Sequence, residues 1–230
     1  MSRDVSTPED LRAVVDGIMA GFAKVPDDGW ERPAHQLDWD CRDTATHLMD
    51  DFTFYALNLS SREVHTDDYV PFLEPPPWRE GSPPMFCWPD PAGGTAAIVR
   101  GVDATGGLLV AVTATAPEGH VGYHPFGHPD ASGFAAIGIV EGAVHAWDVL
   151  TAHDIPFAVD AGIAERVLNR VFPDARRTDD PWNDLLAATG RTEETRGTSW
   201  RWDSSVRDTY GVRDDRGVRD DPGVRDSSGD

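Results

Sequence analysis

Three ionisable residues in the stretch 139–150 have the types and spacing that metal or acid–base chemistry requires. Glu141, His145 and Asp148 lie four and then three residues apart, so on an α-helix all three project from one face. The same face carries the apolar Ile137 and should therefore point toward the protein interior. A carboxylate there is costly unless it is paired, hydrogen-bonded or bound to a metal. This conflict is the main functional clue in the sequence.

A further candidate ligand is expected in an earlier helix, from about residue 40 to residue 60. Its apolar stripe at helical spacing consists of Leu48, Phe52, Tyr55 and Leu59. His47 and Asp51 lie beside that stripe, one turn apart. His47, Glu141 and His145 together supply two imidazoles and one carboxylate, a set that binds zinc or another divalent ion with open coordination positions. The Glu-x-x-x-His spacing alone is common, and its placement on an apolar face gives it weight.

Asp148 is the candidate catalytic residue of this set. It lies one turn beyond His145, where it could hydrogen-bond the imidazole and fix its tautomer, or lie near a substrate. Asp51 could serve His47 in the same way. A purely structural interpretation stays open, in which Glu141 and His145 pair with arginines inside a bundle. A His47 more than about 8 Å from the other two would favour it, because ligands lie about 2 Å from one ion.

Helices with apolar residues at helical spacing are predicted to position these side chains. Thr7 is a plausible N-cap of the first helix, with Pro8 at its first position, and Asp130 or Ser132 caps the fourth. The predicted ranges are 7–24, 40–60, 94–116, 132–153, 160–172 and 181–189.

Two segments between these helices are predicted to be loops. Residues 67–92 contain eight of the 18 prolines, which exclude regular helix, yet the segment also carries large aromatic side chains. We therefore expect a long ordered loop packed over the domain and shaping a pocket mouth. His120, His124 and His128 follow at intervals of four, but Pro125 and the neighbouring glycines break the helix that a shared site would need. These are expected to be loop histidines, with His124 or His128 as candidate pocket residues.

The C-terminus has a different composition. From residue 206 a hexapeptide that begins Val-Arg-Asp occurs four times. One Val in six residues cannot build a core, and glycine and charge dominate the repeats. We expect one folded domain over 1–200 and a disordered tail over 201–230.

Composition and charge exclude several classes of partner. The formal net charge of −20 repels nucleic acid and anionic lipid, so neither is expected to bind. The N-terminus lacks an apolar signal core, and no apolar run is expected to span a bilayer. A cytoplasmic location is therefore predicted, and a monomer or homodimer is the expected assembly. Cys41 and Cys87 are too few for a disulfide framework and are expected to be idle thiols.

Two segments resemble the signature motifs of the DinB-like superfamily. They are Trp39-Asp-Cys-Arg-Asp-Thr-Ala-Thr-His47-Leu and Val140-Glu-Gly-Ala-Val-His145-Ala-Trp-Asp148. They are most similar to the branch named for mycothiol-dependent maleylpyruvate isomerase, and the resemblance covers residues 7–155 in the order and spacing of the helices. It implies a mainly α fold, a DinB-like four-helix bundle. Here the bundle would carry the long Pro-rich loop, extra C-terminal helices and the tail.

The resemblance also implies a metal site and a class of reaction. The family's ligands correspond to His47, Glu141 and His145 in this chain. The expected protein is a metal-dependent enzyme that uses a divalent ion, with Zn²⁺ expected, and mycothiol or a similar low-molecular-weight thiol to transfer or isomerise a small molecule. The short stretch after residue 155 departs from the family enzyme's separate C-terminal domain, which argues against maleylpyruvate itself as substrate.

Two further functions stay open at the level of sequence. A metal-dependent hydrolase would use the same ion to activate water. A non-catalytic bundle would bind the metal and a small ligand without turnover. The sequence has no Ser-His-Asp motif, Gly-rich phosphate loop or basic stripe that would indicate another class.

Overall fold

The computed structural model describes residues 5–64, 67–72 and 75–206, and within these residues the fold is helical with isolated bridges in place of strands. The mainly α prediction is confirmed. The elements, in chain order, are α1 (Pro8–Phe22), η1 (Asp27–Gly29), α2 (Cys41–Ser60), η2 (Pro91–Gly93), α3 (Gly94–Thr115), α4 (Ala131–Thr151), α5 (Ala161–Val171) and α6 (Pro181–Ala188).

Side-chain caps explain where the helices begin. Thr7 and Asp10 form a reciprocal capping box at α1. Asp40 caps α2 and Asp130 caps α4, each by accepting a backbone N–H from the first turn of its helix. Such caps satisfy donors that a helix start leaves without a partner. The cap of α4 is therefore Asp130 and not Ser132.

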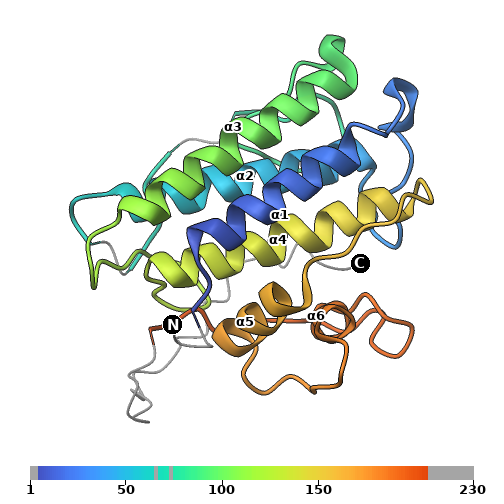
Figure 1. The fold of residues 1–230 in the computed structure, drawn as a ribbon. Coiled ribbons are helices and arrows are strands. Elements are labelled where there is room, and N and C mark those ends of the chain that lie inside the picture. The colour runs from blue at the N-terminus through green and yellow to red at the C-terminus, as the bar shows by residue number, and fades with distance from the viewer. Residues whose placement is uncertain (1–4, 65–66, 73–74, 207–230) are drawn as a thin grey trace.

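The first four helices form a bundle in which α2 and α4 are neighbours (Figure 1). Helices α1 and α2 each pack against both α3 and α4, while α5 packs on α4 and α6 on α5. Since α2 carries His47 and α4 carries Glu141 and His145, this arrangement brings the candidate ligands to one inter-helix contact.

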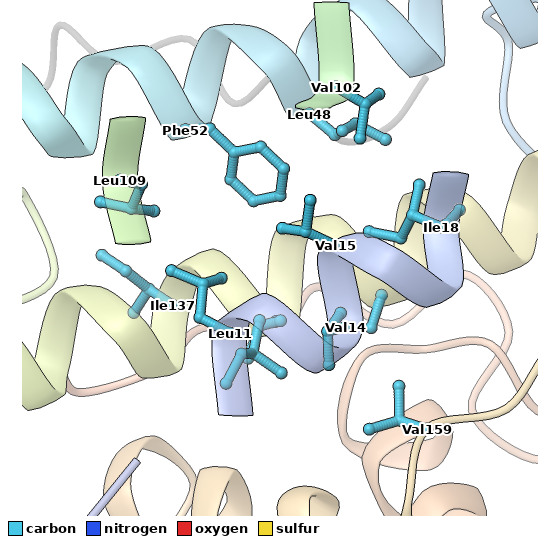
Figure 2. Close-up of a cluster of buried hydrophobic side chains, with 14 of the residues drawn as sticks. Leu11, Val14, Val15, Ile18, Leu48, Phe52, Val102, Leu109, Ile137 and Val159 are labelled. Atoms are coloured by element: carbon cyan, nitrogen blue, oxygen red, sulfur yellow. The ribbon is translucent and has the colours of Figure 1, made fainter. Parts of the chain in front are cut away.

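The bundle core is apolar and closely packed (Figure 2). Its buried side chains come from all four helices and include Leu11, Val15, Ile18, Leu48, Phe52, Val102, Leu109 and Ile137. Glycines allow α4 to approach its neighbours closely. A Cβ on Gly142 would lie 2.8 Å from Phe52 Cζ, and one on Gly138 would lie 2.7 Å from Leu109 Cδ2. This close fit sets the register of the helix that carries Glu141.

Helix α4 is buried all round, not along one stripe as the apolar pattern suggested. From residue 133 to residue 150, every side chain except the half-buried Trp147 is buried. The reason is that α1, α2 and α3 pack on parts of the helix, and α5 and the segment after α6 pack on others.

Within the described residues, two helices qualify as membrane spans by length and composition, which corrects the expectation that no apolar run is long enough. They are Pro91–Thr115 and Ala131–Thr151. In the second, 94% of the apolar window is buried inside the protein, as in a core helix, whereas 22% of the first window is buried.

The Pro-rich segment is an ordered loop packed on α2. Over residues 67–72 and 75–90 it contains neither helix nor strand. The Phe86 amide donates to Asp50 Oδ1 at 2.6 Å, and Met85 is buried. The prediction of a packed loop is confirmed, and the rings of Tyr69 and Phe86 pack on Phe54 of α2.

The segment after α6 returns to the bundle. The Ser204 amide donates to the Phe126 carbonyl at 2.9 Å, the Arg170 guanidinium donates to the Ser204 carbonyl, and Trp202 is buried. The packed part of the chain therefore extends past the predicted boundary at residue 200. The rest of the predicted tail, residues 207–230, lies outside the described residues.

Candidate metal centre

The three predicted ligands lie together between α2 and α4. One ligand atom from each of His47, Glu141 and His145 falls within 4.8 Å of the others. The His145 Nε2 and Glu141 Oε2 atoms are 3.0 Å apart, and the two imidazole rings are 5.0 Å apart between centroids. The separation of more than about 8 Å that would have favoured a purely structural interpretation is not observed.

The centre is mostly closed from solvent, and His47 is its most exposed member. Glu141 and His145 are 5% and 6% exposed, whereas the His47 side chain is 25% exposed. The edge of Trp39 packs against His47, with ring centroids 5.0 Å apart. A small molecule would therefore approach on the His47 and Trp39 side.

Burial makes His47 a neutral imidazole. Desolvation and the neighbouring His145 lower the pKa of His47 to about 4, against a smaller opposing effect of Glu141. A neutral imidazole keeps the lone pair that a metal ligand needs.

The opposite pKa shifts of Glu141 and His145 favour an ionised pair when no ion separates them. Burial opposes charge on Glu141, but the His145 imidazole 3.0 Å away outweighs it and lowers the pKa of Glu141. Burial likewise opposes charge on His145, while the nearby Asp148 and Glu141 carboxylates raise the pKa of His145. The carboxylate is thus held ready as a metal ligand, and a metal must displace one proton from His145.

The residues present fit a divalent cation. Glu141 Oε2 is buried without a hydrogen-bond partner among the described residues, although it lies 3.0 Å from the His145 ring nitrogen. An orphaned carboxylate oxygen beside two imidazoles is costly in an apolar helix. Two imidazoles and a carboxylate with open positions suit zinc or another divalent transition ion.

Asp148 lies behind His145 and has no access to solvent. Its Oδ2 atom is 3.4 Å from His145 Nδ1 and accepts a 2.9 Å hydrogen bond from Arg191 Nη2. The Asp148 side chain is 0% exposed. Of the two roles considered for Asp148, this position suits orientation of His145 better than contact with a substrate.

Asp51 borders the centre on the α2 side. Its Oδ2 atom lies 3.4 Å from His47 Nε2 and is otherwise without a hydrogen bond. Burial and the charges of Glu141 and Asp50 raise the pKa of Asp51 well above its usual value. A neutral Asp51 carboxyl could donate a hydrogen bond beside His47.

One of the three loop histidines forms part of a buried aromatic cluster next to Asp51. His124 packs against Tyr55, Tyr69 and Trp202, with ring centroids 5.8, 6.3 and 5.2 Å away. Its Nδ1 accepts the Phe126 amide at 3.0 Å, so Nε2 carries the proton of the neutral ring. The residues around it at 117–130 form no helix, which confirms the prediction of loop histidines.

Cys41, at the start of α2, is not a nucleophile. Its side chain is buried, and desolvation and the charge of Asp40 raise the pKa of the Cys41 thiol to about 12. A thiol of this kind stays protonated at neutral pH. The prediction of an idle thiol holds for Cys41.

Arg191 and Tyr55 border the site without having been predicted as site residues. Arg191 lies 43 residues beyond Asp148, outside the region of resemblance, and no local pattern connects them. Tyr55 was assigned to the core stripe of α2, where it lies one turn after Asp51. The helical spacing was the one available signal for Tyr55.

Comparison with known protein families yields a match to part of the chain. A family model described as the mycothiol maleylpyruvate isomerase N-terminal domain matches residues 11–150. No curated protein and no solved structure matches the chain. The matched range contains His47, Glu141 and His145 together with most of the four-helix bundle, and it ends before α5, α6 and Arg191.

Proposed function

Because the chain belongs to the mycothiol maleylpyruvate isomerase N-terminal domain family, we propose that it is a metal-dependent enzyme that acts with a low-molecular-weight thiol. The thiol would be mycothiol or a similar compound, and the reaction a transfer or isomerisation of a small molecule. The proposed ligands are His47, Glu141 and His145. The observation that supports the proposal most directly is the convergence of their three ligand atoms within 4.8 Å.

The proposed roles follow from the surroundings of each side chain. A divalent ion at this centre would lower the pKa of a bound thiol or water and so supply a nucleophile at neutral pH. His47 and His145 would bind as neutral imidazoles, and Glu141 as a carboxylate. Asp148 would orient His145, and the Trp39 edge beside His47 would line the approach of the substrate.

The chain offers no competing thiol nucleophile near the centre in its described part. Cys41 is buried and has a raised pKa. A thiol-dependent reaction would therefore need an external thiol, which supports a soluble thiol as co-substrate. We place the protein in the cytoplasm, where thiols are kept reduced.

The test is metal analysis combined with a thiol-transfer assay. Protein purified without chelator is expected to contain one divalent ion per chain and to conjugate or isomerise electrophilic small molecules only when mycothiol or a similar thiol is added. His145→Ala should lose both the ion and the activity, because two remaining ligands hold a divalent ion poorly.

The matched control is His120→Ala, a loop histidine outside the ligand cluster, which should keep both properties. If His145→Ala keeps its ion and its activity, the proposal fails. Turnover of esters or amides without thiol would indicate the hydrolase instead. Metal uptake with a raised melting temperature, but no turnover of any panel compound, would indicate the non-catalytic bundle.

A further inference from the structure

Arg191 reaches the candidate metal centre from outside the matched family domain. The match ends at residue 150, and Arg191 follows α6. Its Nη2 donates to Asp148 Oδ2 at 2.9 Å, and its Nη1 donates to the Thr189 carbonyl at 2.6 Å. The side chains of Arg191 and Asp148 are 4% and 0% exposed, so the ion pair is fully enclosed by protein.

The Asp148 carboxylate connects this guanidinium to a candidate ligand. One oxygen, Oδ2, lies 2.9 Å from Arg191 Nη2 and 3.4 Å from His145 Nδ1. The other ring nitrogen of His145, Nε2, faces Glu141 Oε2 at 3.0 Å. A guanidinium N–H fixed on one side of Oδ2 restrains rotation of the carboxylate and keeps the oxygen beside the imidazole.

The local backbone fixes the guanidinium in turn. The Arg191 amide donates to the Leu186 carbonyl at 2.7 Å. The preceding Gly190 has a φ of +73°, which favours glycine, and its carbonyl accepts from the Gln36 side chain at 2.8 Å. The ring of Trp200 lies 5.3 Å from the guanidinium carbon. Arg191 is thus held by contacts before any metal binds.

Stability alone does not account for this arrangement. A buried ion pair contributes little net stability, because desolvation of both charges offsets their attraction. A hydrogen-bonded carboxylate behind a histidine ligand, by contrast, fixes the tautomer and the ring orientation.

We propose that Arg191 is a positioning residue of the metal centre. It holds Asp148 Oδ2 3.4 Å from His145 Nδ1, a buried ring nitrogen without a hydrogen-bond partner among the described residues. With an ion bound, this oxygen would accept the Nδ1 proton and leave Nε2 as the ligand nitrogen. The segment after α6 is therefore part of the centre, although it lies beyond the matched family domain. This inference rests on the proposed metal site, and it extends that site to a residue that contacts neither metal nor substrate.

The test compares full-length wild type, Arg191→Gln, Arg191→Lys and Arg196→Gln, each titrated with Co²⁺. The dissociation constant is measured by competition with a chromophoric chelator, and the visible d–d spectrum reports the ligand geometry. Arg191→Gln should weaken Co²⁺ binding by roughly 10- to 100-fold and alter the spectrum. Arg191→Lys should recover part of the loss, because it restores the charge but not the planar fork.

Arg196 is the matched control, since it is an exposed arginine of the same segment, and Arg196→Gln should match wild type in both readouts. A folded Arg191→Gln with wild-type affinity and spectrum would overturn the inference. A merely structural Arg191 would lower the melting temperature of the metal-free protein and leave the Co²⁺ affinity and spectrum of the folded protein unchanged.

Two further comparisons keep the test decisive. Should Arg191→Gln not fold, the variant Asp148→Asn/Arg191→Gln removes both buried charges together, and it should bind Co²⁺ as weakly as Asp148→Asn alone. Wild-type affinity in that folded double variant would overturn the inference. A wild-type protein that binds no divalent ion would overturn the proposed function and the inference with it, whereas equal binding by wild type and Arg191→Gln overturns the inference alone.

Discussion

At the scale of single residues, Glu141 and His145 show how a carboxylate is accommodated in a buried apolar helix. Without an ion, the proton of His145 balances Glu141, as the lowered pKa of the acid and the raised pKa of the base indicate. With an ion, the cation would take the place of that proton. The same two side chains can thus be neutralised in two ways, and the metal-free protein avoids an isolated buried charge.

His124 should make the protein sensitive to acid. Burial lowers the pKa of His124 from 6.5 to about 4, so the folded protein disfavours the imidazolium. The contribution of neutral His124 to the free energy of unfolding is fully present above pH 6.5. It is lost as the pH falls from 6.5 to 4, because the unfolded chain binds the proton at a higher pH than the folded chain does. The loss is about 3 kcal/mol.

The variant His124→Asn tests this. In the wild type the Phe126 amide donates a hydrogen bond to His124 Nδ1, and the asparagine Oδ1 can accept the same bond. The free energy of unfolding is measured by urea titration at pH 7 and at pH 4, with chelator present. We expect its loss between these pH values to be about 3 kcal/mol smaller in His124→Asn than in wild type. His120→Asn is the control and should follow wild type. Identical pH profiles for wild type and His124→Asn would mean that His124 titrates freely in the folded state.

At the scale of elements, two adjacent glycines of α3 differ in why glycine is present. One is needed for close packing against α1, and the other is not. A Cβ on Gly106 would lie 2.7 Å from Val15 Cγ2, a buried core atom. A Cβ on Gly107 would meet only Arg12 Nη2 at 3.0 Å, the far end of a flexible side chain. The first glycine is required by the contact of α3 with α1, and the second is not.

Gly106→Ala should therefore destabilise the protein by about 1–3 kcal/mol through overpacking. Gly107→Ala should stabilise it by up to about 1 kcal/mol, because alanine is the better helix former. Denaturant titration of the two variants measures both effects. Equal shifts of the same sign would show that the contact between α1 and α3 is looser than the distances indicate.

At the scale of the whole molecule, a metal bound between α2 and α4 would link the two halves of the bundle. Any ligand that binds only the folded state stabilises it, by about 2.7 kcal/mol at a free concentration of 100 times Kd. For a domain of this size, that corresponds to a rise in Tm of roughly 5–11 °C.

We expect Zn²⁺ to raise the Tm of chelator-treated wild type by this amount, and chelator to reverse the rise. Glu141→Gln should show little or none of it, because an amide is a much weaker ligand than a carboxylate. Thermal scans of both proteins with and without Zn²⁺ give the comparison. A full Tm rise in Glu141→Gln would place the stabilising ion elsewhere.

Sequence by itself determined the helices and the local geometry of the candidate site. The helix predicted at 94–116 is observed as Gly94–Thr115, and the one at 132–153 as Ala131–Thr151. Helical periodicity and caps are local properties of the chain, so they can be read without the fold. For the same reason Glu141, His145 and Asp148 could be assigned to one face. His47 was grouped with Glu141 and His145 by ligand type, and the family resemblance implied the same set.

Tertiary structure alone decided what surrounds that face. It placed α2 beside α4, buried α4 on all sides, and brought Arg191 to Asp148 across 43 residues of chain. It also packed the segment through Ser204 against α5 and the 124–127 loop, past the boundary predicted at residue 200. The physical reason is that such contacts depend on side-chain fit between distant segments, which residue periodicity does not encode.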